Sequence, residues 1–308
     1  MEYLLLVVGF VLLIKGADFF VEGSSSVAKR LRVPSLIIGM TIVAMGTSLP
    51  ECAVSVSASI AGKNGLAISN AVGSNIFNLM VVCGVCALFC PLAVEASTLK
   101  KEFPFSILIA ILLLVFGVTG MLVGHLEGIL LLVVFTFFIL WMIQSARKAR
   151  SEAEEEEYEI LPIWKCIVFI IGGAAGIAVG GQLVVDSAST IAKNFGMTDT
   201  LIGLTIVAFG TSLPELVTSV VAARKNEVDM ALGNVIGSNI FNILFVLGIA
   251  AAISPIGFKM ENIIDIAVLV GMSALVWIFA WTKQKLTRLE GSIMLLLYGA
   301  YMVYICIR

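Results

Sequence analysis

Long apolar runs separated by short polar segments dominate the chain. A membrane-spanning helix needs about 20 mostly apolar residues, and runs of this kind recur ten times. The predicted spans are residues 3–21, 34–60, 67–90, 103–123, 127–146, 163–185, 201–223, 230–253, 263–281 and 289–307. The pattern therefore predicts an all-α polytopic membrane protein with ten transmembrane helices.

The most polar connection, residues 147–162, divides these spans into two sets of five. Three basic residues are followed there by a run of glutamates, which is typical of a solvated segment. We predict a first five-helix repeat at residues 1–146, an acidic linker at 147–162 and a second five-helix repeat at 163–308.

Composition supports this class and excludes others. Hydrophobic residues make up 60% of the 308 residues and charged residues 13%, with a mean hydropathy of +1.08. Soluble chains carry about 25% charged residues. The net charge of −2 argues against a nucleic-acid partner. The N-terminal apolar run has no basic leader region, so we interpret it as the first span.

Basic residues gather on one side of the predicted membrane. That side holds the loops with Lys29, Arg30, Lys100 and Lys283 as well as the linker, whereas few bases lie on the other side. Because basic loops stay cytoplasmic, we expect a multi-pass protein of the cell (inner) membrane. Its linker would be cytoplasmic and both termini outside.

The chain repeats itself at an offset of 164 residues. Residues 39–91 align without a gap on residues 203–255, with 26 of 53 positions identical. The block TIVAMGTSLPE at 41–51 returns as TIVAFGTSLPE at 205–215, and GSNIFN at 73–78 returns unchanged at 237–242. Since each half holds five spans, an odd number, the second half must enter the membrane inverted, as in secondary transporters.

Each repeat carries one carboxylate inside a span, Glu51 and Glu215. A charge there is costly unless it is compensated, and no Lys or Arg occupies the same layer of both halves. Lys15 is the nearest base, but the equivalent residue of the second half is Val179. A bound cation is therefore the expected partner.

The neighbouring residues offer further oxygen ligands. Pro50 and Pro214 interrupt their helices and should free main-chain carbonyls of the preceding turn. Hydroxyl and amide oxygens lie nearby, and neither thiol nor imidazole accompanies them. Hard oxygen donors of this kind suit Ca²⁺ or Na⁺. The candidate metal ligands are Glu51, Glu215, Thr47, Thr211, Ser48, Ser212, Ser74, Ser238, Asn78, Asn242, Ala44 and Ala208.

At these blocks the sequence resembles the cation/calcium exchanger superfamily, and within it the prokaryotic sodium/calcium exchangers. The resemblance extends over essentially the whole chain. It implies a ten-helix fold whose second, third, seventh and eighth helices form the ion site. It also implies exchange of Na⁺ for Ca²⁺, commonly three to one, as the long first and sixth helices slide across the core.

The same resemblance assigns roles to the candidate residues. Glu51 and Glu215 would be ligands shared by Ca²⁺ and Na⁺, and Asn78 and Asn242 would line the central position. The remaining roles are main-chain carbonyls to Ca²⁺ from Thr47 and Thr211, and flanking Na⁺ sites from Ser48, Ser74, Ser212 and Ser238 with the carbonyls of Ala44 and Ala208. Some relatives, including potassium-dependent ones, carry Asp at the position of Asn242, so Asn here argues against K⁺ co-transport.

Charge arithmetic predicts an electrogenic cycle. Three Na⁺ on two carboxylates leave one positive charge, whereas one Ca²⁺ leaves none. The alternatives are a proton/calcium antiporter and, in a different class, a passive cation channel. An enzyme is disfavoured because Ser48 and Ser212 have no general base of the kind that activates a nucleophile. We expect no cofactor, no nucleic acid, Na⁺ and Ca²⁺ as substrates, the lipid bilayer as surroundings, and function as a monomer.

Overall fold

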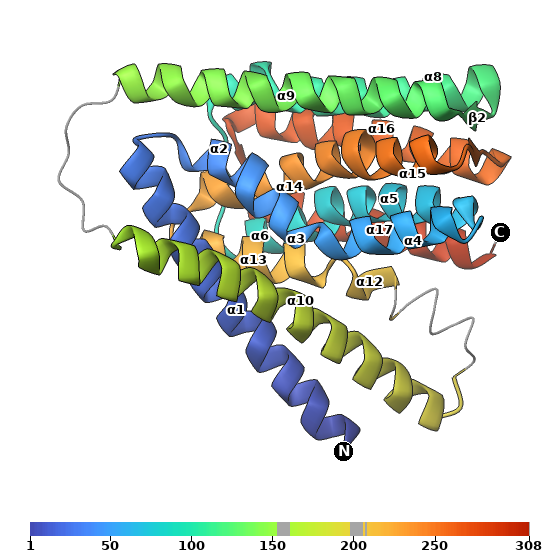
Figure 1. Cartoon of the computed structure of the whole chain (residues 1–308), viewed down its shortest axis with the longest axis horizontal. Coiled ribbons are helices and arrows are strands. Elements are labelled where there is room, and N and C mark those ends of the chain that lie inside the picture. The colour runs from blue at the N-terminus through green and yellow to red at the C-terminus, as the bar shows by residue number, and fades with distance from the viewer. Residues whose placement is uncertain (153–160, 198–205, 207, 308) are drawn as a thin grey trace.

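The computed structural model describes residues 1–152, 161–197, 206 and 208–307. Eight helices in these residues are long and apolar enough to cross a membrane, and the pair Ser35–Thr47 and Leu49–Ile60, bent by 50°, makes a ninth. The predicted span 201–223 begins outside the described residues. Most of the acidic run of the linker also lies outside them. The chain is an all-α polytopic membrane protein, as predicted, and these helices are consistent with ten spans (Figure 1).

The elements before the linker are, in chain order, α1 (Glu2–Leu31), α2 (Ser35–Ile38), the π-helical turn η1 (Gly39–Val43), α3 (Ala44–Thr47), α4 (Leu49–Ile60), α5 (Asn64–Phe77), the π-helical turn η2 (Asn78–Val82), α6 (Cys83–Phe89), β1 (Leu92–Ala93), α7 (Ala96–Lys100), α8 (Glu102–Gly120), β2 (Leu122–Val123) and α9 (His125–Glu152).

The elements after it are α10 (Ile163–Asn194), α12 (Ala208–Gly210), α13 (Leu213–Arg224), α14 (Val228–Phe241), the π-helical turn η4 (Asn242–Val246), α15 (Leu247–Ile253), β3 (Ile256–Gly257), α16 (Met260–Lys283), β4 (Lys285–Leu286) and α17 (Arg288–Ile307).

The repeated sequence adopts repeated structure. Helices α4, α5 and α6 have the bounds of α13, α14 and α15 shifted by 164 residues, and η2 and η4 keep the same offset. Two-residue strands, which the sequence pattern did not predict, connect the halves crosswise. β1 pairs with β4, and β2 pairs with β3, both antiparallel. Two short strand pairs, each with one strand from each half, therefore join the two halves.

The third and eighth spans form the centre of the molecule. In the segments Asn64–Phe89 and Val228–Ile253, 72% and 78% of the most apolar 18-residue stretch is buried inside the protein. The corresponding share in the other long helices is 33% or less. The repeated GSNIFN blocks end α5 and α14, so they lie in this central layer. The outer helices expose large apolar side chains, as lipid-facing helices do.

Helices α1 and α10 lie side by side and cross the other helices obliquely (Figure 1). Glycines line their contact. A Cβ added to Gly16 would lie 2.8 Å from the main-chain nitrogen of Ile177, and one added to Gly180 would lie 2.5 Å from that of Leu13. Small residues of this kind let membrane helices approach closely. The pair therefore packs as one unit.

Both of these helices are longer than predicted. α1 continues to Leu31 rather than ending near residue 21, and α10 continues to Asn194 rather than 185. The apolar pattern lapses in α1 because Ser24, Ser25 and Ser26 are polar, yet all three are buried against protein. A helix of 30 residues is about 45 Å long, which exceeds the hydrocarbon layer and accords with the oblique path.

Candidate functional site

Two helix breaks create the local geometry of the site. Ser48 (φ −87°, ψ 11°) separates α3 from α4, and Ser212 (φ −95°, ψ 6°) precedes α13 in the same way. Pro50 and Pro214 lie in the first turn of the helix that follows. Pro50 has no N–H, so the Gly46 carbonyl lacks its usual donor four residues on. The predicted interruption is confirmed in both halves.

The breaks place one glutamate in the first turn of each new helix. Glu51 and Glu215 are both 0% exposed. The N-terminal turn of a helix favours a negative charge because its N–H groups have no helical acceptors. Within the part of the chain that the structure describes, neither carboxylate forms an ion pair with Lys or Arg. Two buried carboxylates therefore share one interior without a basic partner.

Hydroxyl groups connect the two carboxylates across the repeat. Ser48 donates to Glu215 Oε1 at 2.7 Å, and Ser212 lies 3.3 Å from Glu51 Oε1. Ser212 Oγ also lies 3.1 Å from Ser74 Oγ. Each serine at a helix break thus contacts the glutamate of the other half, and the structure brings these five predicted residues together.

The second oxygen of each carboxylate has no hydrogen-bond partner among the described residues. The same is true of other buried oxygens from the repeated blocks. This set consists of Glu51 Oε2, Glu215 Oε2, Asn78 Oδ1, Asn242 Oδ1, Ser238 Oγ and Thr211 Oγ1. Buried polar atoms are normally paired, so oxygens left free in this number indicate a group that the protein alone does not supply.

One main-chain carbonyl that we expected to be free keeps its helical partners. The Ala44 carbonyl is not free, since it accepts from the Ser48 main-chain nitrogen at 3.1 Å and from Thr47 Oγ1 at 3.3 Å. The helix break falls after Ser48, so the regular bond between Ala44 and Ser48 survives. The counterpart Ala208 lies in α12, beside residues outside the described part of the chain.

Two asparagines that sequence reasoning missed support the carboxylate helices. Asn70 donates to the Glu51 carbonyl at 3.2 Å and to Ser55 Oγ at 2.9 Å. Its equivalent Asn234 donates to the Glu215 carbonyl at 3.4 Å and to Ser219 Oγ at 2.9 Å, and accepts from Thr47 Oγ1 at 3.1 Å. The two asparagines and their serine partners Ser55 and Ser219 lie outside the quoted blocks, but their identity between the repeats was a usable signal.

Two further asparagines were missed inside the GSNIFN blocks. Asn75 and Asn239 are at most 2% exposed, and each donates to the main-chain carbonyl of the other. Asn78 and Asn242 in turn donate to their side-chain oxygens. The predicted residues Asn78 and Asn242 are thus brought together with neighbours that fix their orientation.

The chemistry of the site is that of neutral and anionic oxygen. The described residues contain no cluster of three or more His, Cys, Asp or Glu side chains. Hydroxyl and amide oxygens, together with main-chain carbonyls, would therefore complete any coordination around the two carboxylates. Such donors suit hard cations with flexible coordination, Ca²⁺ and Na⁺, better than Zn²⁺ or Cu⁺.

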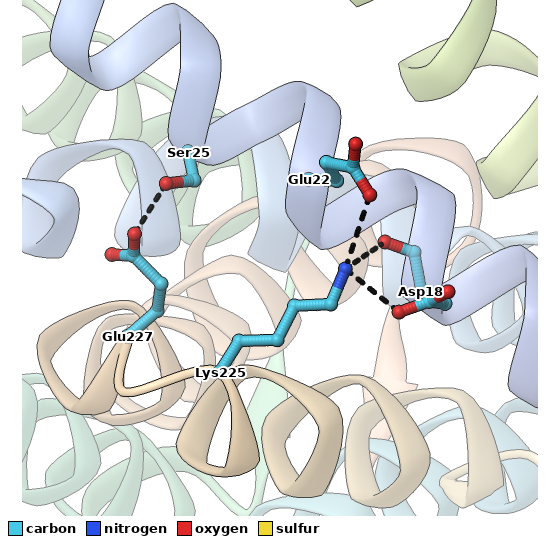
Figure 2. Close-up of polar contacts among 5 residues, drawn as sticks. All are labelled: Asp18, Glu22, Ser25, Lys225 and Glu227. Atoms are coloured by element: carbon cyan, nitrogen blue, oxygen red, sulfur yellow. Dashed lines mark hydrogen bonds and ion pairs between the residues drawn. The ribbon is translucent and has the colours of Figure 1, made fainter. Parts of the chain in front are cut away.

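A second polar cluster lies on the surface, at the end of the molecule where α1 ends and α10 begins, which we call the linker end. Lys225 Nζ lies 2.7 Å from Asp18 Oδ1 and 3.3 Å from Glu22 Oε2 (Figure 2). Glu227 accepts from Ser25, and from Ser35 at 2.7 Å. Asp18 and Glu22 of α1 therefore join this helix to the connection between α13 and α14.

Comparisons with known proteins agree along the whole chain. The family model described as sodium/calcium exchanger protein matches residues 1–144 and 165–307. The chain is 33% identical to the sodium/calcium exchanger MaX1 of Methanosarcina acetivorans, over 98% of this chain and 97% of that one. It is 38% identical to the inner membrane protein YrbG of Escherichia coli, over 82% and 79%.

A solved structure shares the fold. The sodium-calcium exchanger NCX_Mj, soaked with 10 mM Na⁺ and 10 mM Sr²⁺, matches with a TM-score of 0.87 and 35% identity. The match covers 98% of this chain and 97% of that one. Together with the family model, it shows that the chain belongs to the sodium/calcium exchanger family.

Proposed function

We propose that this protein is a secondary active antiporter that exchanges Na⁺ for Ca²⁺ by alternating access through the site around Glu51 and Glu215. One observation carries the proposal. Two fully buried carboxylates lie without a basic partner, and each keeps one oxygen free of hydrogen bonds within the described residues. Such a pair is costly to bury unless a cation joins it.

The donor set matches both ions. The two carboxylates neutralise one Ca²⁺, and amide and hydroxyl oxygens can bring its coordination to the six to eight contacts that Ca²⁺ prefers. Na⁺ accepts the same oxygen donors. We assign the ligand roles to Glu51, Glu215 and the Ser, Thr and Asn residues predicted from the sequence.

Membership of an ion-exchanger family makes the chain a cation/Ca²⁺ antiporter rather than an enzyme. The choice of Na⁺ over H⁺ as coupling ion is our proposal. It is supported by the serines at both helix breaks, and by the similarity of the chain to MaX1 and NCX_Mj, which are both named as sodium/calcium exchangers.

We propose a stoichiometry of three Na⁺ to one Ca²⁺. The loaded site then carries one positive charge with Na⁺ and none with Ca²⁺, so a cycle moves one net charge. Moving that charge is worth about 2.3 kcal/mol per 100 mV. Exchange should therefore respond to the membrane potential.

The proposed setting is the cell (inner) membrane, with the protein acting as a monomer. The linker would be cytoplasmic and both termini outside, as the distribution of basic residues favours. Inverted repeats move one bundle against another around a fixed site. We propose that the α1–α10 pair and the central broken helices are the two bodies that move relative to each other.

The test is ⁴⁵Ca²⁺ uptake by proteoliposomes loaded with Na⁺ and diluted into Na⁺-free buffer. Vesicles loaded with K⁺ or with acid are assayed in parallel, and so is the variant Glu51→Gln. Uptake that requires internal Na⁺ and disappears in Glu51→Gln is the expected result. Clamping the potential with valinomycin and K⁺ should change the rate.

Other outcomes contradict specific parts of the proposal. Equal uptake from acid-loaded vesicles would indicate proton coupling, and uptake without any counter-ion gradient would indicate a channel. A Ca²⁺ uptake rate that stays the same when the membrane potential is clamped would exclude the three-to-one stoichiometry.

A further inference from the structure

Four buried asparagines meet where the two central helices change to π-helical turns. Asn75 and Asn78 come from the end of α5 and the start of η2, and Asn239 and Asn242 come from the same places in α14 and η4. All are at most 2% exposed. Burial of an amide without hydrogen bonds is costly, so their donors and acceptors should be matched.

The first pair is oriented by the main chain. Asn75 Nδ2 donates to the Asn239 carbonyl at 3.1 Å, and Asn239 Nδ2 donates to the Asn75 carbonyl at 3.3 Å. A main-chain carbonyl can only accept, so the nitrogen of each side chain must face the opposite helix. Each Oδ1 atom is consequently directed elsewhere and can act only as an acceptor.

The second pair is oriented by the first. Asn242 Nδ2 donates to Asn75 Oδ1 at 3.1 Å, and Asn78 Nδ2 donates to Asn239 Oδ1 at 3.3 Å. Because these acceptors are fixed, Asn78 and Asn242 must present their nitrogens to them. Their oxygens then lie on the other side of the amide, and both are buried without a partner among the described residues.

We propose that Asn75 and Asn239 are positioning residues of the ion site, which hold Asn242 and Asn78 with the amide oxygen, and not the nitrogen, toward the ion. This inference rests on the proposed function of that site. An amide flipped by half a turn would aim N–H groups at a cation and repel it. The arrangement also requires a donor at residue 242, which Asn supplies and an ionised Asp would not.

A double-mutant cycle separates positioning from mere packing. Asn75→Ala removes the acceptor that orients Asn242. In the Asn242→Asp background orientation no longer matters, since both ends of a carboxylate are oxygen. We therefore expect Asn75→Ala to weaken Ca²⁺ binding about tenfold in the wild-type background, the loss expected for about one oriented hydrogen bond. In Asn242→Asp the same change should cause no further loss.

The measurement is ⁴⁵Ca²⁺ binding to the full-length purified protein in detergent, without Na⁺, with thermal unfolding recorded for each variant. The symmetric cycle of Asn239→Ala with Asn78→Asp provides a second, independent test if one variant fails to fold. Asn70→Ala is the matched control, because it removes a half-buried asparagine of the same hairpin that bonds to α4. The loss of Ca²⁺ affinity caused by Asn70→Ala should be equal in both backgrounds.

The outcomes separate this proposal from the proposed function. An equal loss from Asn75→Ala in both backgrounds would overturn the positioning role while leaving exchange intact. Binding that follows the expected cycle in a protein without Na⁺-driven uptake would support positioning and overturn Na⁺ coupling. A wild-type protein that binds no Ca²⁺ would overturn both.

Discussion

Lys225 forms an ion pair with Asp18 that has no equivalent in the other half of the molecule. Their charged atoms are 2.7 Å apart, and Glu22 adds a second carboxylate at 3.3 Å. The residues related by the repeat are Ala61 and Gln182. At the linker end this ion pair fastens α1 to a connection between core helices (Figure 2), and the two residues related to it by the repeat cannot form one.

We expect Lys225→Ala to shift the balance between the two access states. The ion pair favours the arrangement in which α1 lies on the α13–α14 connection, and its partly exposed position limits its contribution to about 0.2–1 kcal/mol. Removing it should populate the state open at the linker end up to about fivefold more. The KM for Ca²⁺ should then fall at that side and rise at the other.

The measurement is sided ⁴⁵Ca²⁺ uptake in oriented vesicles at low and high ionic strength. The shift should shrink at high salt, because salt screens exposed charges. Arg224→Ala serves as the control, since it removes the adjacent positive charge and leaves the Lys225 contacts in place. An identical shift in Arg224→Ala would mean that surface charge alone is responsible.

Glu51→Gln should make the ion-free protein more stable but insensitive to Ca²⁺. Removing one of two buried carboxylates relieves a desolvation cost of a few kcal/mol. The wild-type protein should gain about 2.7 kcal/mol at a Ca²⁺ concentration of 100 times Kd, and the variant none. Thermal unfolding in chelator and in Ca²⁺ measures both effects. Glu102→Gln, which changes a buried glutamate outside the site, should keep the Ca²⁺ response, and its loss there would discredit the assignment.

The two supporting asparagines should not be equally important. Among the described residues, Asn234 forms three hydrogen bonds, one of them with Thr47 in the other half, whereas Asn70 forms two within its own half. A net hydrogen bond contributes about 1 kcal/mol. Asn234→Ala should therefore lower the free energy of unfolding about 1 kcal/mol more than Asn70→Ala. Chemical or thermal unfolding of both variants decides the matter, and equal losses would show that the Thr47 contact adds nothing.

The carboxylates were predictable because the bilayer makes them conspicuous. A glutamate inside an apolar span demands a partner, and the repeat marks which neighbours accompany it. The helix breaks at Pro50 and Pro214 follow from the chemistry of proline alone. Local sequence thus indicated most of the residues that the structure brings together around Glu51 and Glu215.

The asparagine network was not predictable in the same way. Asn75 and Asn239 become partners only because α5 and α14 cross at that level, which no local pattern states. Likewise, the serines of α1 interrupt the apolar pattern although the helix continues, since they face protein rather than lipid. Whether the Ala44 carbonyl keeps its hydrogen bond from the Ser48 main-chain nitrogen depends on the side of Ser48 at which the helix breaks. These features are set by packing between distant segments.

The glycine contact between α1 and α10 provides a test of the pair as one unit. A Cβ added at Gly173 would lie 2.7 Å from both the Gly16 carbonyl oxygen and the Phe20 main-chain nitrogen, whereas one added at Gly172 meets nothing within 4 Å. Overpacking costs about 1–3 kcal/mol, and alanine otherwise favours a helix by about 1 kcal/mol over glycine. Gly173→Ala should therefore lower the thermal midpoint and the exchange rate, while Gly172→Ala should leave the rate unchanged and raise the midpoint slightly. Since the two positions are adjacent on one helix, equal behaviour of the variants would mean that the close approach of α1 and α10 is not what holds the pair together.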